Sequence, residues 1–254
     1  MSGILAGKVA LISGSARGQG ASHARVLAAG GAQVVVTDIL DDLGGAIAAE
    51  IGDAALYTRL DVRSTADWAA AVELAERSFG GLDILINNAG IVGMEGAGEC
   101  SDEEWDEVIA VNQTGVFRGT RAAIPALRRA GGGSIVNISS TLGLKGAGAY
   151  VAYTASKHAV IGITKQTAVQ YGPENIRANA ICPSSVDTPM HRAEMEYFKD
   201  NPGFDFDKWL GDSHPIARIA EPDEVSHLIL YLVSPKAGWV TGGSFSVDGG
   251  FMAG

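Results

Sequence analysis

A tyrosine and a lysine stand four positions apart in the run Tyr153-Thr-Ala-Ser-Lys157. Residues at this spacing project from the same face of a helix, so the ammonium of Lys157 is expected to lie near the phenol and favour its ionised form. An unperturbed phenol has a pKa of about 10, too high for efficient proton exchange at neutral pH. The pair therefore predicts a tyrosine that works as acid and base, with the upstream Ser140 holding the reacting oxygen. On an exposed helix, the same spacing means only a packed ring and a solvated amine.

A glycine-rich turn follows the apolar run at residues 9–13 and precedes a helical pattern that continues to Ala29. Gly14, Gly18 and Gly20 allow a tight turn and a close approach of the backbone to a pyrophosphate. The amides at the start of the following helix then point at its negative charge. This strand, turn and helix order predicts a dinucleotide-binding loop.

A second strand-like run, residues 33–38, ends in the carboxylate of Asp38. An acid at this place hydrogen-bonds the adenosine ribose and repels a 2'-phosphate, which predicts NAD rather than NADP. Arg17 argues the other way, because a guanidinium can clamp a phosphate. We give Asp38 more weight, since two like charges about 4 Å apart cost on the order of a few kcal/mol near a protein surface. The alternative for Asp38 is an acid that only ends a strand in a turn.

Apolar strand-like runs alternate with helical stretches along all 254 residues, of which 46% are hydrophobic and 19% are charged. Such alternation predicts an α/β chain with a doubly wound, parallel, seven-stranded sheet flanked by helices. No linker or repeat divides the sequence, so we expect one domain over residues 1–254. The strand-like runs are residues 9–13, 33–38, 54–62, 83–88, 134–140, 176–182 and 243–248.

The formal net charge of -10 disfavours binding to nucleic acid or to an anionic membrane surface. The sequence shows neither a signal-peptide pattern nor an apolar run long enough to span a bilayer, and we expect a cytoplasmic protein. Cys100 and Cys182 form no Cys-x-x-Cys pair and are expected to be ordinary buried thiols. We predict no metal site, because the histidines lack metal-ligand spacing. They are His23, His158, His191, His214 and His227.

Several motifs occur in the order and spacing of a known family. They are the glycine loop, Asn87-Asn88-Ala89-Gly90, Asn112, Ser140, Tyr153 and Lys157, with Asp61-Val62, the segment from Pro183 to Met190, and Val247-Asp-Gly-Gly250. Together they resemble the compact subgroup of the short-chain dehydrogenase/reductase family over nearly the whole chain. The resemblance implies a single-domain Rossmann fold and a homotetramer packed through helices at residues 104–123 and 151–171.

The resemblance also implies roles for the catalytic residues. Tyr153 would exchange a proton with the substrate oxygen, Lys157 would lower the pKa of Tyr153 and bind the nicotinamide ribose, and Ser140 would hydrogen-bond the reacting oxygen. Asn112 would hold a water that links Lys157 to solvent. The residues implied to contact NAD are Gly14, Arg17, Gly18, Gln19, Gly20, Asp38, Ile39, Asp61, Val62, Asn88, Ala89, Gly90, Tyr153, Lys157, Pro183, Val186 and Thr188. Two positions depart from the family pattern: Gln19 replaces an aliphatic residue, and Ser184 replaces a glycine beside the substrate pocket.

The polar, interrupted segment at residues 191–214 carries five aromatic side chains and follows the nicotinamide-side motif directly. We predict a substrate lid that closes an apolar pocket, which implies a bulky, apolar substrate. The alternative is that these rings pack against the body of the protein or a neighbouring subunit. They are Tyr197, Phe198, Phe204, Phe206 and Trp209.

The runs at residues 16–23, 38–41 and 131–140 look most like those of bacterial hydroxysteroid and related secondary-alcohol dehydrogenases. We therefore expect an NAD-dependent enzyme that interconverts a secondary alcohol and a ketone, with a bulky, apolar or cyclic substrate such as a hydroxysteroid or a terpene alcohol. One alternative is a 3-oxoacyl carrier-protein reductase that uses NADPH, against which Asp38 counts. Another is a nucleotide-sensing or scaffolding module without catalysis, which the complete catalytic set disfavours.

Overall fold

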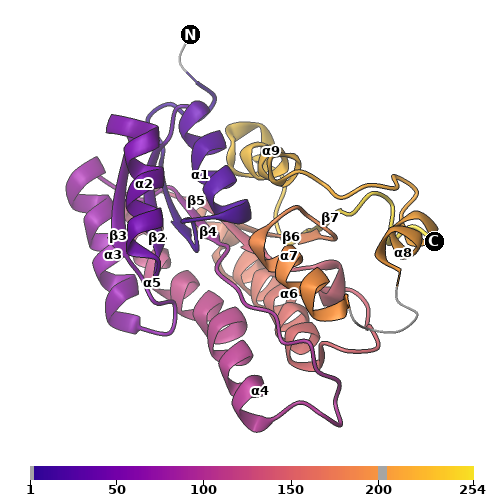
Figure 1. Cartoon of the computed structure of the whole chain (residues 1–254). Helices are drawn as coiled ribbons and strands as arrows, with labels where there is room; N and C mark the ends of the chain where they lie inside the picture. The colour runs from indigo at the N-terminus through magenta and orange to yellow at the C-terminus, as the bar shows by residue number, and fades with distance from the viewer. Residues whose placement is uncertain (1–2, 200–204) are drawn as a thin grey trace.

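The computed structural model describes residues 3–199 and 205–254. Its seven strands form one sheet in the order β3-β2-β1-β4-β5-β6-β7, and every neighbouring pair is parallel (Figure 1). The predicted doubly wound parallel sheet is thus confirmed. The strands are β1 Val9–Ser13, β2 Gln33–Asp38, β3 Ala55–Arg59, β4 Ile84–Asn87, β5 Gly133–Ile138, β6 Ile176–Pro183 and β7 Ser244–Val247.

The third strand is shorter than its predicted run at residues 54–62. The Leu60 N–H still donates to the carbonyl of Asp38, at 2.9 Å, but the chain then turns, with Ser64 N–H bonded to Asp61 O at 2.8 Å. Asp61 and Val62 therefore leave the sheet edge in a turn, and this turn brings them to the loops that follow β1 and β2.

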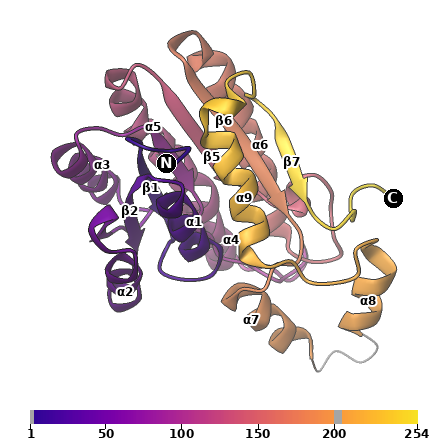
Figure 2. The same cartoon turned by 90° about the horizontal axis from the view of Figure 1, so that it is seen from above.

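Helices cover both faces of the sheet (Figure 2). Apolar side chains of α1, α2 and α9 pack on one face, and those of α3, α5 and α6 pack on the other. The α-helices are α1 Gly18–Ala29, α2 Asp41–Ile51, α3 Thr65–Phe79, α4 Asp102–Ile109, α5 Gly115–Arg129, α6 Val151–Tyr171, α7 Pro189–Phe198, α8 Phe206–Ser213 and α9 Pro222–Val233.

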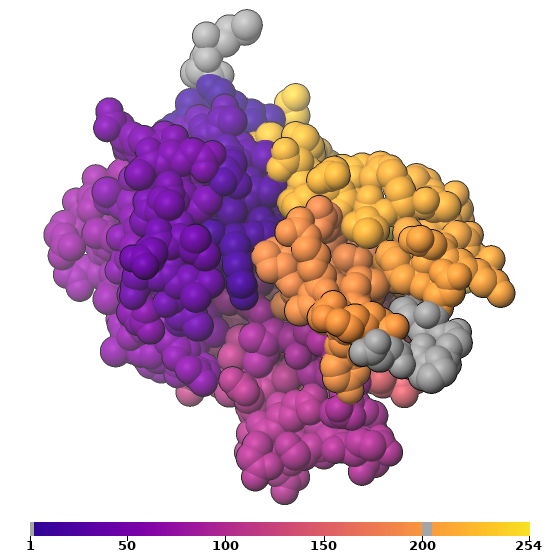
Figure 3. Space-filling model, viewed as in Figure 1, coloured from indigo at the N-terminus to yellow at the C-terminus, as the bar shows by residue number. Residues whose placement is uncertain are grey.

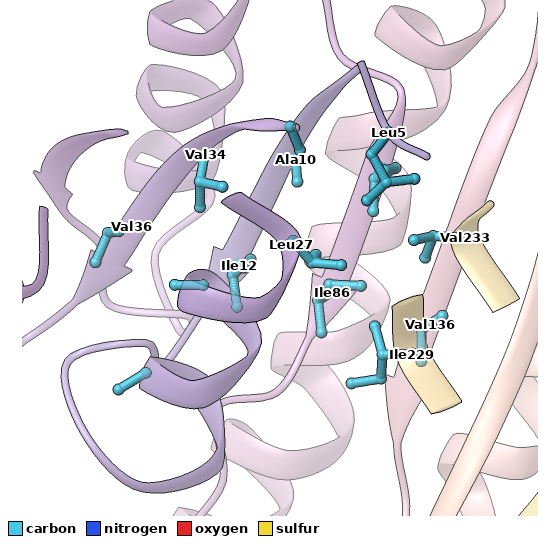
Figure 4. Packing of buried hydrophobic residues seen from close by; sticks show 14 of the residues in the cluster. Leu5, Ala10, Ile12, Leu27, Val34, Val36, Ile86, Val136, Ile229 and Val233 are labelled. Carbon is cyan, nitrogen blue, oxygen red and sulfur yellow. The ribbon is translucent and has the colours of Figure 1, made fainter. Parts of the chain in front are cut away.

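The core follows from the two-residue period of the strands. In β1, Ala10 and Ile12 join the cluster under α1 and α9 that Figure 4 shows, whereas Val9 and Leu11 join the cluster on the opposite face. Both faces of the strand are therefore buried, as is usual where helices cover a parallel sheet on each side.

The parallel direction places the carboxyl ends of all strands at one edge of the sheet. β1 and β4 are neighbours there, although the chain leaves β1 toward β2 on its other side. Such a reversal of strand order opens a crevice between the loops that follow the two strands, and ligands of open α/β sheets bind in it. The loops after β1, β2, β4, β5 and β6 all leave the sheet at this edge.

A π-helical segment, Ala110–Thr114, interrupts the helix expected at residues 104–123 and separates α4 from α5. Its wider turn inserts an extra residue into the helical ladder, and such segments occur frequently at functional sites. The buried Asn112 lies at its centre. In the part of the chain that the structure describes, no helix is long and apolar enough to cross a membrane. The same residues include no group of three or more His, Cys, Asp or Glu side chains placed to hold a metal ion.

His23 on α1 is fully buried against α9. Its Nδ1 lies 2.7 Å from the Ser226 hydroxyl, which in turn contacts the hydroxyl of Ser22. Nε2 has no hydrogen-bond partner among the described residues. Burial lowers the pKa of His23 from 6.5 to about 3, although the carboxylate of Asp223 acts in the opposite direction. The imidazole is therefore neutral in the folded protein at any physiological pH.

This burial predicts a loss of stability in acid. Above pH 6.5 the imidazole is neutral in both states, but below it the unfolded chain binds a proton that the folded protein does not. The contribution of His23 should therefore lower the free energy of unfolding by about 1.4 kcal/mol for each pH unit between 6.5 and 3. Urea unfolding between pH 7 and pH 5 measures it. His23→Gln should show a flatter dependence than the wild type, whereas the exposed His227→Gln should not; equal slopes in all three proteins would contradict the assignment.

Candidate active site

One cavity of about 1040 Å³ opens at the carboxyl edge of the sheet. It extends from the glycine loop and Asp38 past Lys157 to Phe251 near the C-terminus. In Figure 3, the orange segment that contains α7 lies on the surface beside the first elements of the chain (indigo). Residues of α7 line the cavity. All catalytic and cofactor-binding residues predicted from the sequence line the cavity except Asn112.

The backbone conformation and close contacts of the loop after β1 explain why glycines occupy it. Gly14 and Gly18 adopt φ angles of 65° and 55°, in the left-handed region that side chains disfavour. A Cβ on Gly20 would lie 2.1 Å from the carbonyl oxygen of Gly14 and 2.5 Å from Asn88 Nδ2. That amide nitrogen donates to the carbonyls of Ser13, at 3.0 Å, and Gly14, at 2.8 Å. The loop after β4 therefore braces the loop after β1, and α1 begins with its free amides facing the cavity.

Asp38 is buried at the end of β2 and organises the neighbouring backbone. One carboxylate oxygen accepts the N–H of Ala16 at 3.0 Å, and the other accepts those of Ile39 and Leu40 at 2.8 and 3.1 Å. A carboxylate has about four acceptor positions, so these three bonds leave capacity for a ligand hydroxyl at the cavity. Asp38 thus fixes the backbone that follows β2 and also lines the cavity. Arg17 is exposed at the rim of the cavity.

The other predicted cofactor residues complete this half of the cavity. Asp61 is bound by the Arg63 guanidinium, with contacts from 2.7 to 3.1 Å, and the Arg63 side chain holds the pKa of that carboxyl below its usual range. Ile39 lines the cavity with half of its surface exposed. Val62, Ala89, Gly90, Pro183, Val186 and Thr188 supply mostly apolar or backbone surface.

Lys157 reaches from α6 to the end of β5, where its ammonium donates to the carbonyl oxygen of Ile138 at 2.8 Å. The side chain is buried, and burial lowers its pKa from 10.5 to about 8. A Cβ on Gly90 would lie 3.5 Å from Nζ, which places this loop residue in van der Waals contact with the ammonium. The ammonium therefore lies at the junction of β5, α6 and the loop after β4.

The sequence predicts that Lys157 lowers the pKa of Tyr153, and the structure differs. Burial raises the pKa of Tyr153 from 10.0 to about 12, while a hydrogen bond from Ser140 acts in the lowering direction. The Lys157 ammonium lies 5.3 Å from the centre of the Tyr153 ring, over its face, and is directed to Ile138. The phenol is therefore neutral near pH 7 in this structure, and its hydrogen-bond partner is Ser140 rather than Lys157.

Asn112 lies behind the cavity and not in its wall. Its side chain is fully buried and forms two bonds with the backbone of Ile91, Oδ1 accepting the N–H at 2.9 Å and Nδ2 donating to the carbonyl at 2.8 Å. A third contact joins Nδ2 to the hydroxyl of Ser156 at 3.2 Å. All side-chain polar groups of Asn112 are therefore used in fixing the loop after β4 to α6. Only its backbone remains for the water predicted from the sequence.

The far end of the cavity is a wall of stacked rings. His214 and Phe251 are parallel, with ring centres 4.8 Å apart, and Trp209 meets both edge-on. Ser184 hydrogen-bonds His214 Nε2 at 2.8 Å, so the serine that replaces the family glycine anchors this wall. Ser213 contacts the other ring nitrogen at 2.8 Å. Trp209 and Phe251 line the cavity, whereas the buried His214 supports them from outside its lining.

Sequence reasoning missed a second polar group in the cavity. Tyr150 has a left-handed backbone with φ 68° at the start of α6, and its hydroxyl donates to Glu194 on α7. His191 Nδ1 lies 3.6 Å from the other oxygen of this carboxylate. The only available signal was the position of Tyr150 three residues before Tyr153, because the partners come from a segment more than forty residues away.

The segment predicted as a lid forms α7 and α8 at the cavity. Phe198, Phe206 and Trp209 line it, whereas Tyr197 is half exposed and its hydroxyl donates to Glu95 at 2.9 Å. The rings of His191 and Phe206 lie 5.2 Å apart and join the two helices. The predicted Phe204 lies outside the described residues. The described rings of this segment thus line the cavity and contact the body of the protein, and their action as a lid stays a prediction.

Comparison with known proteins gives one consistent assignment. A family described as enoyl-(acyl carrier protein) reductase matches residues 14–252. The 3-alpha-(or 20-beta)-hydroxysteroid dehydrogenase of Mycobacterium tuberculosis is 50% identical over all of this chain and 93% of its own length. This chain belongs to the short-chain dehydrogenase/reductase family. It is an oxidoreductase, since its relatives are dehydrogenases of secondary alcohols.

Two further relatives extend the comparison. The trans-4-hydroxycyclohexanecarboxylate dehydrogenase of Sinomonas cyclohexanicum is 44% identical over 98% of this chain and 95% of its own. The crystal structure of a 3-ketoacyl-(acyl-carrier-protein) reductase from Brucella melitensis complexed with NADH superposes with a TM-score of 0.89 and 37% identity, covering 97% of this chain and 99% of that one. The predicted fold, family and enzyme class are confirmed.

The family uses a nicotinamide cofactor, and the residues present fit one. The left-handed glycines, the free amides at the start of α1 and the single cavity joining them to Lys157 and Tyr153 suit a long, anionic dinucleotide. Gln19 Oε1 is buried beside this loop and has no hydrogen-bond partner among the described residues.

The packing of the glycine loop predicts that Gly20→Ala blocks cofactor binding. The new Cβ would collide with the Gly14 carbonyl, and the loop would have to move away from the pyrophosphate. Titration of NADH fluorescence should show a dissociation constant at least about tenfold weaker. Gly45→Ala on α2, where a Cβ meets nothing within 4 Å, should bind normally. Unchanged binding by a folded Gly20→Ala protein would refute this role of the loop.

Proposed function

We propose that this enzyme interconverts a cyclic secondary alcohol and its ketone with NAD(H), using Tyr153 as acid and base. The observation that carries the proposal is that Ser140, Tyr153 and Lys157 line one cavity with the glycine loop and Asp38. A cofactor bound along that loop therefore meets the substrate beside the phenol.

The chain's own residues account for proton transfer and orientation. In ketone reduction, the neutral phenol of Tyr153 donates its proton to the carbonyl oxygen, and the Ser140 hydroxyl hydrogen-bonds the same oxygen as negative charge develops. In alcohol oxidation the phenol must first lose its proton. The nicotinamide supplies or accepts the hydride when bound.

Lys157 and Asn112 serve this proton transfer indirectly. The buried ammonium of Lys157 faces the cavity from beside Ile138 and would bind the ribose hydroxyls. With a pKa of about 8, it also releases a proton more readily than an exposed lysine. Because the Asn112 side chain is fully engaged, its backbone carbonyl in the π-helical turn would hold the water that connects Lys157 with solvent.

The preference for NAD over NADP rests on Asp38. Its carboxylate is fixed by three backbone N–H groups and cannot swing aside to admit a 2'-phosphate without leaving them unpaired. Arg17 is exposed at the rim and has room to point away.

A ring-shaped substrate is supported by the aromatic wall of Trp209, His214 and Phe251 and by the relatives, which include hydroxysteroid and cyclic-alcohol dehydrogenases. The alternative is a 3-oxoacyl carrier-protein reductase. The Brucella reductase was crystallised with NADH, so a preference for NAD does not by itself separate the two functions. The net charge of -10 favours the small-molecule substrate over an acidic carrier protein.

We further propose a cytoplasmic homotetramer in which α7 and α8 act as the substrate lid. Trp105 on α4, Phe117 on α5 and Val169 on α6 expose 38%, 48% and 79% of their surface. These apolar side chains stand on the helices expected to pack between subunits, and their burial there would be favourable. The bond between Tyr197 and Glu95 would release when the lid opens.

Removal of the Tyr153 hydroxyl tests the mechanism. Tyr153→Phe should bind NADH within about twofold of the wild type and lose at least about a thousandfold in kcat with cyclopentanol or a hydroxysteroid, because only the proton donor is deleted. Tyr171→Phe, at the far end of α6, provides the matched control and should retain activity. Substantial turnover by Tyr153→Phe would show that another group carries the proton.

Replacement of the strand-end acid tests the cofactor preference. Asp38→Asn keeps the shape of the side chain while removing its charge, so the ratio of kcat/KM for NAD over NADP should fall by about tenfold or more. Asp42→Asn, nearby on α2 but outside the cavity lining, should leave the ratio unchanged. An unchanged ratio in Asp38→Asn would mean that the carboxylate does not face the adenosine ribose.

A further inference from the structure

The loop between Ser140 and α6 places a cation at the substrate end of the cavity. Lys145 lines the cavity, and its backbone N–H donates to the carbonyl of Thr141 at 3.1 Å, which ties the residue to the turn that carries Ser140. Its ammonium lies 4.1 Å from the centre of the Phe251 ring. A cation at this distance over an aromatic face is attracted by the ring and is thereby held at the wall.

Phe251 is itself fixed in place. The ring of His214 stacks parallel to it with the centres 4.8 Å apart, and so covers one of its faces. The Lys145 ammonium at 4.1 Å must therefore occupy the other face. Because Ser184 hydrogen-bonds His214, the unusual serine beside Pro183 positions this whole stack. The contacts thus run from Ser184, in the loop after β6, through the rings of His214 and Phe251 to the ammonium of Lys145.

The cation has no internal counter-ion. Among residues 3–199 and 205–254, no carboxylate forms an ion pair with Lys145. Three carboxylates at the same cavity are already engaged: Asp38 by backbone N–H groups, Asp61 by Arg63, and Glu194 by Tyr150 and His191. Glu107, the fourth carboxylate in the cavity lining, forms no ion pair with Lys145 either. Within the described residues, the Lys145 ammonium is therefore available to an anionic ligand.

We propose that Lys145 binds a carboxylate on the substrate, so that the preferred substrates are cyclic secondary alcohols or ketones carrying an acid group remote from the reacting carbon. This proposal rests on the proposed function. The reacting oxygen would meet Ser140 and Tyr153, the ring would lie along Trp209, and the acid group would meet the ammonium beside Phe251. A partner charge at a partly open site adds affinity that falls as salt is raised.

The test compares two alcohols that differ mainly in charge, trans-4-hydroxycyclohexanecarboxylate and trans-4-methylcyclohexanol, under saturating NAD. The wild type should favour the carboxylate in kcat/KM by about tenfold at low salt, and the preference should shrink at high salt. Lys145→Met should raise KM for the carboxylate by about tenfold and leave kcat and the neutral alcohol unchanged. Lys145→Arg should keep the preference, and the exposed Lys236→Met should behave as the wild type.

The outcomes separate this inference from the proposed function. Turnover of the neutral alcohol with no preference for the acid, or with a preference that survives in Lys145→Met, overturns the carboxylate site and leaves the alcohol dehydrogenase in place. Turnover of neither cyclic alcohol, with activity on 3-hydroxybutyryl-coenzyme A instead, overturns both.

Discussion

The parallel register of the sheet is the constraint on which the site depends. Parallel strands bring all their carboxyl ends to one edge, so the loops that follow β1, β2, β4, β5 and β6 converge there although their residues are far apart in sequence. A slip of one residue in any strand would turn its whole apolar set to the other face. Burial on both faces forbids this, because alternating residues of β1 belong to different core clusters. Packing of the core thus fixes the positions of Gly14, Asp38 and Ser140 at this edge.

Most polar side chains at the carboxyl edge of the sheet form hydrogen bonds with neighbouring backbone groups. Asp38 and Asn112 spend most of their hydrogen-bonding capacity on neighbouring backbone, which fixes the loops. Lys157 is buried with a single carbonyl partner, Ile138, and this burial lowers its pKa to about 8. A buried ammonium with one hydrogen-bond partner lowers the stability of the folded protein. A lysine in such a position is therefore typical of a functional site. The structure holds the reacting groups on α6 and at the end of β5, which are rigid elements, and leaves substrate contacts to loops.

The substrate end is built differently from the cofactor end. The cofactor end is formed by the loops that follow the first four strands, whereas the wall of Trp209, His214 and Phe251 joins α8 to the segment after β7. Ser184 ties this wall to the loop after β6. Family members can therefore share one cofactor site while differing in substrate, because the two ends are formed by separate segments.

The sequence by itself determined the parts whose signals are local. The alternation of apolar strand-like runs with helical stretches predicted the parallel sheet, and the glycine spacing between a strand and a helix predicted the nucleotide loop. The four-residue spacing of Tyr153 and Lys157 placed both on one face of α6. Tertiary structure alone decided the electrostatics and the substrate wall. Burial raises the pKa of Tyr153 to about 12, contrary to the expected lowering, because desolvation depends on what packs around the phenol. The contacts of Lys145 with Phe251 and of Tyr150 with Glu194 join segments distant in the chain, and no local pattern encodes such pairs.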